Sequence, residues 1–238
     1  MIYIIEHVAV EGPGTIENYL RKKEIPFKTI GLYRGDSFPA SLKDVTAVIC
    51  MGGPMNVYEE DKFPFLKEEN KFIQKVLKNK IPYLGVCLGS QLLAKAVGTK
   101  VVKSPVKEVG WFNVDLRKEA KNDPLFKDVP PKFDVYHWHE DMFEIPQDGV
   151  FLATGDGCPH QAFRIGKNAY GIQFHIEITD RSIKEWSDEY CQKDFPGRKE
   201  KCEEMMAVYR RTKKDFLHQA YRVYDNFLRI IEKRSRKN

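Results

Sequence analysis

A cysteine between two glycines is the residue of this chain best placed to do chemistry. Residues 85–91 read Gly-Val-Cys-Leu-Gly-Ser-Gln and join a short β-prone run, 81–84, to a helix-prone run, 91–96. This pattern is typical of a nucleophile elbow, a sharp turn that exposes a nucleophile between a strand and a helix. The N-terminus of a helix carries partial positive charge and unpaired N–H groups, which favour a thiolate. A lone cysteine in such a turn is more often simply buried, so the prediction that Cys87 is a nucleophile needs a second motif.

A histidine and a carboxylate far downstream supply that motif. Residues 171–177 read Gly-Ile-Gln-Phe-His-Ile-Glu, and the apolar alternation over 170–174 predicts a strand that delivers His175 at its end, with Glu177 facing the same way. An imidazole can take the proton of a thiol, and a carboxylate fixes its tautomer and supports its charge. Cys87, His175 and Glu177 therefore form a complete set of nucleophile, base and orienting group.

Paired glycines end another apolar run. Residues 47–55 read Ala-Val-Ile-Cys-Met-Gly-Gly-Pro-Met, which predicts a buried strand followed by Gly52 and Gly53. Glycines at a strand end let backbone N–H groups approach a substrate closely, as an oxyanion hole requires. Alone, the pattern would indicate an ordinary turn.

In this order, the three motifs resemble those of the class I glutamine amidotransferase family, the type with a Cys-His-Glu triad, and the chain looks like a stand-alone relative of the glutaminase domain of GMP synthase. The nucleophile motif of the family, Gly-x-Cys-x-Gly-x-Gln, matches 85–91, and its base motif, Phe-His-Pro-Glu, matches 174–177 except that Ile176 replaces the proline. The resemblance covers residues 40–180. It implies a flavodoxin-like open α/β sheet, mostly parallel, with helices on both faces and the site at the carboxyl ends of the strands.

The resemblance also implies a role for each matched residue. Cys87 would attack the side-chain amide of glutamine and form a γ-glutamyl thioester, with His175 as acid and base and Glu177 as its orienting group. The backbone N–H groups of Gly53 and Leu88 would hold the oxyanion.

Further residues would contact the substrate. The family has a strand end near residues 136–141 whose backbone holds the α-amino and carboxylate groups of glutamine. The expected substrate contacts are Gly52, Gln91, His139, Glu140 and Asp141.

The same segment has a second interpretation as a metal site. His137-x-His139-x-Asp141 begins the His-x-His-x-Asp-His pattern of metallo-β-lactamase-type zinc sites, but Met142 stands where the next histidine should be. Zinc needs enough ligands to close or nearly close its shell, and the other histidines show no companion spacing. We therefore expect no metal, and no cofactor is implied.

Composition indicates one folded unit. At 238 residues with 42% hydrophobic content, the chain can bury one good core. No apolar stretch approaches bilayer length and residues 1–6 lack the features of a signal peptide, so no membrane association is expected. Five cysteines, an odd number without paired spacing, favour reduced thiols and a cytoplasmic setting.

Strands and helices are expected to alternate before a change of pattern. The alternation predicts a mostly parallel sheet, and the pieces after the elbow helix predict an antiparallel extension. The expected strands are 2–5, 27–30, 46–51, 81–84, 108–116, 133–138, 150–154, 161–165 and 169–174, and the expected helices are 14–23, 65–77, 91–96 and 179–192.

The C-terminal segment differs in character. We divide the chain into an α/β domain, 1–194, and a basic extension, 195–238. Residues 198–238 hold 13 Lys and Arg but 6 Asp and Glu, so the formal charge of +5 comes entirely from this tail. Apolar residues recur with helical spacing from Phe216 to Ile231, which predicts an amphipathic helix packed on the domain. An acidic partner would fit its basic face, but nothing in it reads as a nucleic-acid recognition motif.

Two classes of function stay open. One is a cysteine-nucleophile hydrolase, either of glutamine, with ammonia passed to a synthetase, or of γ-glutamyl peptides. No Gly-x-x-x-x-Gly-Lys-[Ser/Thr] motif is present, so ATP-driven amination would need a separate synthetase subunit. The other class is a non-catalytic protein that binds a partner through its tail.

Overall fold

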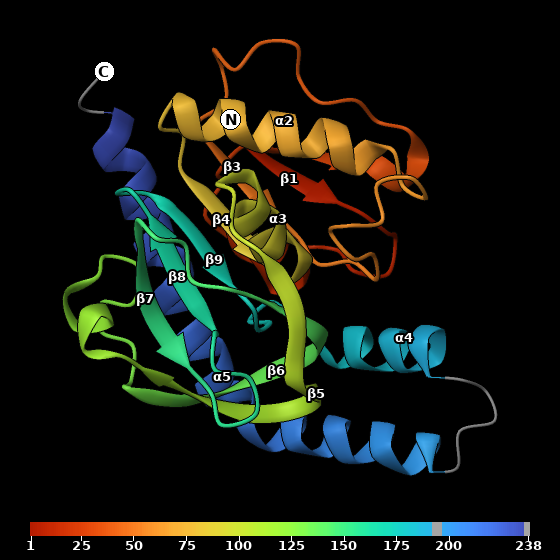
Figure 1. The fold of residues 1–238 in the computed structure, drawn as a ribbon. Coiled ribbons are helices and arrows are strands. Elements are labelled where there is room, and N and C mark those ends of the chain that lie inside the picture. The colour runs from red at the N-terminus through yellow and green to blue at the C-terminus, as the bar shows by residue number, and fades with distance from the viewer. Residues whose placement is uncertain (192–196, 236–238) are drawn as a thin grey trace.

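The computed structural model describes residues 1–191 and 197–235. These residues form a nine-stranded sheet in the order β2-β1-β3-β4-β9-β8-β7-β5-β6 (Figure 1). The first five strands in this order run parallel, and the other four are antiparallel to their neighbours. The strands are β1 Ile2–Glu6, β2 Phe27–Gly31, β3 Ala47–Cys50, β4 Tyr83–Val86, β5 Val101–Leu116, β6 Lys132–Phe143, β7 Gly149–Thr154, β8 Ala162–Ile165 and β9 Ala169–Ile172.

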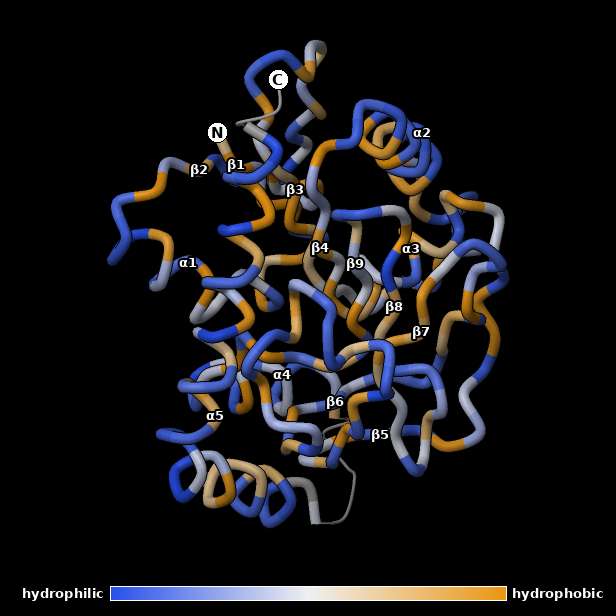
Figure 2. Tube along the Cα trace, turned by 90° about the vertical axis from the view of Figure 1, so that its left-hand side faces the viewer, coloured by the Kyte–Doolittle hydropathy of each residue, from blue (hydrophilic) through white to orange (hydrophobic). Residues whose placement is uncertain are grey.

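Helices cover both faces of the parallel part of the sheet. Alternate residues of a strand face opposite sides, so Ile4 packs with the helices α1 and α5, whereas Ile5 packs with α2 and α3. Figure 2 shows β1 and β3 coloured mainly as hydrophobic, as expected of strands buried on both faces. The helices are α1 Gly14–Lys22, α2 Phe65–Lys78, α3 Leu88–Ala96, α4 Asp180–Tyr190 and α5 Arg198–Ser235, with two 3₁₀ turns, η1 Leu32–Arg34 and η2 Lys118–Asn122.

The predicted α/β architecture is confirmed, and several strand boundaries are corrected. The fold is a mostly parallel sheet with an antiparallel extension and a C-terminal helix, as expected. The strand expected at 108–116 begins at Val101, and the strand expected at 169–174 ends at Ile172, so His175 follows it in a loop. Likewise, β6 does not end near residue 138. Its pairing with β5 continues across an irregularity between Lys103 and Glu108 and reaches Phe143. The segment expected at a strand end, residues 139–141, therefore lies inside a strand.

The helix α5 packs along its length on the rest of the chain. Its first half contacts α4, β5 and β6, and its second half contacts α1 and the sheet (Figure 1). The predicted apolar stripe is buried at Phe216, Val223, Phe227 and Ile231. The boundary expected at 194/195 lies outside the described residues. Across 1–191 and 197–235, no helix combines the length and apolar content that crossing a bilayer requires.

Candidate active site

Cys87 lies at a tight turn between β4 and α3. Its backbone has φ +49° and ψ −109°, a conformation that costs energy in a residue with a side chain and is found mostly at functional sites. The flanking glycines permit this turn. A side chain at Gly85 would collide with the backbone of Gly89, and one at Gly89 would collide with the carbonyl of Cys50. The Gly-x-Cys-x-Gly spacing is thus a packing requirement of the elbow.

His175 and Glu177 lie in the loop that follows β9. The backbone N–H of His175 donates to the carbonyl of Tyr136 at 2.8 Å, which ties the loop to β6. Its Nδ1 lies 2.7 Å from Oε1 of Glu177, whose Oε2 accepts the N–H of Ile176 at 3.0 Å. The ring of Trp186 packs edge-on against the imidazole, with centroids 4.8 Å apart. The backbone bond to Tyr136, the hydrogen bond to Glu177 and the ring of Trp186 together fix the orientation of His175.

The electrostatics favour a protonated His175. Burial by itself would lower the pKa of this imidazole, but the carboxylate of Glu177 and the thiol of Cys87 outweigh burial and raise the pKa well above its ordinary value. Nε2 is buried and makes no hydrogen bond that satisfies normal geometry within the described chain. This nitrogen is the one available for proton exchange with Cys87.

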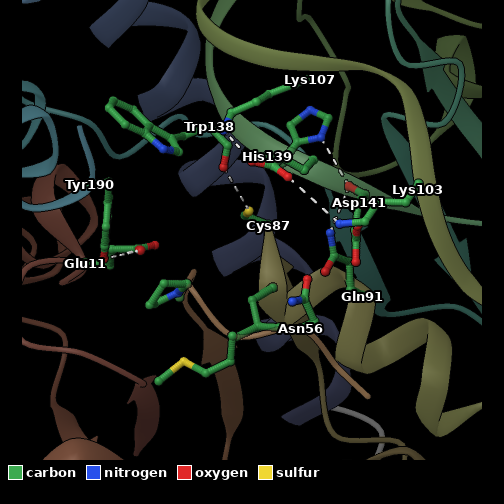
Figure 3. A pocket seen from close by; sticks show the side chains of 15 residues that line it. Glu11, Asn56, Cys87, Gln91, Lys103, Lys107, Trp138, His139, Asp141 and Tyr190 are labelled. Atoms are coloured by element: carbon green, nitrogen blue, oxygen red, sulfur yellow. Dashed lines mark hydrogen bonds and ion pairs between the residues drawn. The ribbon is translucent and has the colours of Figure 1, made fainter. Parts of the chain in front are cut away.

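The thiol of Cys87 opens into a cavity of about 350 Å³ (Figure 3). Its Sγ lies 3.8 Å from the carbonyl oxygen of Trp138 and 3.6 Å from the amide nitrogen of Gln173. Gly53, Leu88 and Gln91 all line the same cavity. The site lies at the carboxyl ends of the parallel strands, where open α/β sheets place ligands.

Gly53 and Leu88, the two residues expected to form the oxyanion hole, both line the cavity. Leu88 is the first residue of α3, so its N–H has no acceptor within the helix. His7 Nδ1 donates to the carbonyl of Gly52 at 2.8 Å. Because C=O and N–H point in opposite directions across a trans peptide, this bond turns the N–H of Gly53 away from His7. Gly52, which was expected to contact the substrate, is not among the described residues that line the cavity, although it lies next to Glu11, His175 and Cys87.

The side chains expected to contact substrate are already held by other groups. Nε2 of Gln91 donates to the carbonyl of Asp141 at 3.0 Å. The Asp141 carboxylate pairs with Lys103 at 2.8 Å, and Glu140 pairs with Lys107. All of these residues line the cavity, and these pairs tie α3, β5 and β6 together around it.

His139 lines the cavity, but both nitrogens of its ring lie within hydrogen-bond distance of other protein groups. Its Nε2 lies 2.9 Å from Oε2 of Glu108 and its Nδ1 lies 3.1 Å from the carbonyl of Asp141. His137 Nδ1 reaches the same carboxylate oxygen at 3.2 Å. The two histidines thus converge on Glu108 of β5, a residue the sequence analysis did not single out, and the Asp141 carboxylate takes no part.

Glu108, His137 and His139 form a cluster that is held together by hydrogen bonds. Burial alone would raise the pKa of Glu108, but the bonds from His137 and His139 outweigh it and lower the pKa to about 2. Burial lowers the pKa of His137 to about 4 despite the carboxylate. Three potential ligand atoms do lie close enough for a metal ion here, and three more lie close together at His7, Cys50 and Glu69. Each of those atoms already has a hydrogen-bond partner inside its cluster.

Several lining residues were not predicted from sequence. Glu11, from the loop after β1, and Tyr190, from the end of α4, lie on one side of Cys87, and Lys103 lies on the other (Figure 3). A carboxylate just after the first strand of a predicted parallel sheet was a usable signal for Glu11, because such strand ends line the ligand site. Nothing in the sequence signalled Tyr190, whose place depends on how α4 packs.

Comparison with known proteins assigns the chain to a family. The model of the class I glutamine amidotransferase family matches residues 15–186. The chain belongs to this family.

Individual relatives agree with that assignment. A glutamine amidotransferase-like protein of Salmonella typhimurium, YfeJ, is 27% identical over 186 residues, which cover 77% of this chain and 78% of that protein. A glutamine-hydrolysing GMP synthase of Thermosipho melanesiensis is 40% identical over 137 residues, 56% of this chain but 24% of the synthase. The crystal structure of a glutamine amidotransferase from Thermotoga maritima superposes with a TM-score of 0.86 at 34% identity and 97% coverage of both chains.

Proposed function

We propose that this chain hydrolyses the side-chain amide of glutamine through a γ-glutamyl thioester on Cys87. The observation that carries the proposal is the placement of Cys87 at a strained elbow facing a cavity, beside the histidine that Glu177 orients. A protein that only binds a partner has no physical need for all three groups. Membership of the class I glutamine amidotransferase family supports the choice of substrate.

The proposed reaction proceeds in two halves. The Cys87 thiolate attacks the amide carbon of glutamine and forms a C–S bond, while the N–H groups of Gly53 and Leu88 bind the oxyanion. The C–N bond then breaks, and His175 donates its proton to the departing nitrogen, which leaves as ammonia. In the second half, His175 removes a proton from water, the resulting hydroxide attacks the thioester carbon, and glutamate departs as the C–S bond breaks.

We further propose that a separate synthetase consumes the ammonia. The matched segment spans about a quarter of the length of the GMP synthase relatives, and no phosphate-binding motif for ATP occurs in this chain. A γ-glutamyl peptide hydrolase with the same three catalytic groups is the second candidate. In its favour, polar residues line the cavity on both sides of Cys87, with Glu11 and Tyr190 on one side and Lys103 on the other (Figure 3).

A comparison of substrates tests the proposal. The purified chain is incubated with glutamine and separately with γ-glutamyl dipeptides, and the release of glutamate is measured. We expect glutamate and an equal amount of ammonia from glutamine, and no product from the Cys87→Ala variant. Release from γ-glutamyl dipeptides alone would favour the second candidate. Release from neither substrate would favour the non-catalytic class.

A further inference from the structure

Glu11 is a buried carboxylate that faces the cavity beside the proposed nucleophile. Its side chain is 6% exposed, and its Oε1 accepts a hydrogen bond from the Tyr190 hydroxyl at 2.7 Å. A methyl group placed on Gly52 would lie 2.5 Å from Oε2 of Glu11, 3.1 Å from Cε1 of His175 and 3.7 Å from Cβ of Cys87. All three side chains therefore surround Gly52, and Glu11 lies next to the reacting groups. The need for glycine at position 52 comes from this crowding.

Charge pairing distinguishes Glu11 from the other carboxylates of the cavity. Three carboxylates are found among the described lining residues. Asp141 is paired with Lys103 and Glu140 with Lys107, whereas no lysine or arginine of residues 1–191 and 197–235 forms an ion pair with Glu11. The nearby imidazole of His175 is held by Glu177.

The rings beside Glu11 suit a positive charge. Trp138 and Tyr190 line the same end of the cavity, with their ring centroids 6.0 Å apart (Figure 3). Aromatic faces attract cations, and a carboxylate adds a charge-assisted hydrogen bond. Burial of the Glu11 carboxylate is costly and raises its pKa, and the imidazoles of His175 and His7 offset only part of this cost. A cation that enters with the ligand would remove this cost.

We propose that Glu11, with Tyr190 and Trp138, forms a subsite that binds an alkylammonium group of the substrate. This inference rests on the proposed hydrolysis of γ-glutamyl amides and adds a recognition element to it. The ammonium group has two possible sources. It is either the α-ammonium of the glutamyl part or an ammonium carried by the amine that leaves.

Two pairs of substrates test the subsite. The first pair is glutamine and 4-carbamoylbutanoate, which lacks the α-ammonium. The second pair is the γ-glutamyl amide of 1,3-diaminopropane and γ-glutamyl n-butylamide, in which a methyl group replaces the terminal ammonium. The value of kcat/KM is measured for the wild type and for Glu11→Gln, which keeps an oxygen to accept the Tyr190 bond.

We expect Glu11→Gln to lower kcat/KM about tenfold or more for the charged member of one pair, the size expected for a charge-assisted hydrogen bond. The uncharged member should change by less than about threefold. A loss confined to the first pair identifies the α-ammonium as the ligand, and a loss confined to the second identifies the leaving amine. Comparison within pairs cancels any general effect of the substitution on His175.

Matched variants and one independent measurement complete the test. Glu6→Gln removes a buried carboxylate of β1 that does not line the cavity, and should change both members of each pair equally. An equal effect of Glu11→Gln on all four substrates, or no effect, overturns the subsite. If the wild type turns over none of the four, the proposed function fails, and calorimetric titration with 1,3-diaminopropane then decides. Weaker binding by Glu11→Gln would support the subsite, whereas equal binding or none would overturn it.

Discussion

The imidazole of His175 has one nitrogen held and one nitrogen free. Glu177 binds Nδ1 at 2.7 Å, and the buried Nε2 makes no normal hydrogen bond within the described chain. A ring in this state can pass a proton at Nε2 without changing its orientation. Removal of the ring and neutralisation of its carboxylate partner should therefore have different consequences.

We expect His175→Ala to lower kcat for glutamine hydrolysis about as much as Cys87→Ala does, because residues that act as a unit do not contribute additively. Glu177→Gln should cost less, since Gln still has an oxygen to accept the Nδ1 bond but lacks the charge that stabilises the imidazolium. Steady-state kinetics of the three variants check this order. Near wild-type hydrolysis by His175→Ala, together with its loss in His139→Ala, would assign the base to His139.

Another residue-scale prediction concerns pH and stability. The pKa of His137 is about 4 in the fold against 6.5 ordinarily, so between pH 6.5 and 4 the unfolded chain binds a proton that the folded chain does not. The free energy of unfolding should therefore fall as pH falls through this window, by up to about 1.4 kcal/mol per pH unit. Below about pH 4.5, protonation of Glu108 in the unfolded chain adds to the loss. Urea unfolding at pH 7, 6, 5 and 4 measures how the free energy of unfolding changes with pH, and His137→Gln should make this change smaller. An unchanged pH dependence in His137→Gln would contradict its attribution to His137.

At the scale of elements, the loop that follows β3 is held by the side chain of His7, the residue directly after β1. His7 Nδ1 donates to the carbonyl of Gly52, and its Nε2 lies 3.1 Å from a carboxylate oxygen of Glu69 on α2. Burial would lower the pKa of His7, but Glu69 outweighs it and raises the pKa. We infer that His7 orients the proposed oxyanion donor at Gly53.

A substitution of His7 tests this inference. Gln carries its amide at the position of Nε2 and has only a methylene group where His7 has Nδ1, so His7→Gln loses the donor to the Gly52 carbonyl and should lower kcat about tenfold or more, within the range for weakening one oxyanion donor. Alkylation of Cys87 by iodoacetamide forms no oxyanion, and its rate should stay within about twofold. Cys50→Ala serves as control, because Cys50 contacts Glu69 but not Gly52. A parallel fall of both rates in His7→Gln would show general damage to the site instead.

Local pattern was sufficient to predict the alternating elements and the elbow, because Gly85 packs against the backbone of Gly89 four residues further on; Gly89 itself packs against Cys50 of β3, a contact that is not local. It was not sufficient for β5 and β6, whose exposed outer residues lack a clean alternation and whose length depends on pairing with each other. Tyr190 and Glu108 were missed for a related reason, because each takes its place through long-range packing that no local pattern encodes. Glu11 comes soon after the first strand, and that position was a signal the sequence did carry.

At the scale of the whole molecule, α5 connects the C-terminal segment to the site. The hydroxyl of Tyr224 donates to the carbonyl of Ile176 at 2.9 Å and lies 2.9 Å from Oγ1 of Thr15. Ile176 lies between His175 and Glu177. The C-terminal helix, which the sequence predicted to pack on the domain, therefore holds the loop that carries both residues.

Two changes in α5 should lower stability by different amounts. Truncation after Gly197 removes all buried apolar side chains of α5, among them Phe216, Val223, Phe227 and Ile231, at about 1.5–3 kcal/mol for each large one. This loss is comparable to the whole stability of a domain, so we expect little folded protein. Tyr224→Phe removes only the hydroxyl and should lower the midpoint of thermal unfolding by about 2–4 °C. Tyr221→Phe, on the same helix and half-buried, is the control. An unchanged midpoint after truncation would mean that α5 does not stabilise the domain.

The central claim is that Cys87 forms a covalent bond with a glutamine-like substrate, and selective labelling tests it most directly. Cys191 and Cys202 are more exposed than Cys87, which is 6% exposed, so simple access would favour those two thiols. The full chain is treated with a glutamine-mimicking electrophile, and the modified cysteines are identified by mass spectrometry, with excess glutamine as competitor. We predict labelling at Cys87 first, protection by glutamine, and strong slowing in His175→Ala. Labelling that follows exposure, with Cys191 and Cys202 ahead of Cys87 and no protection by glutamine, would contradict the account.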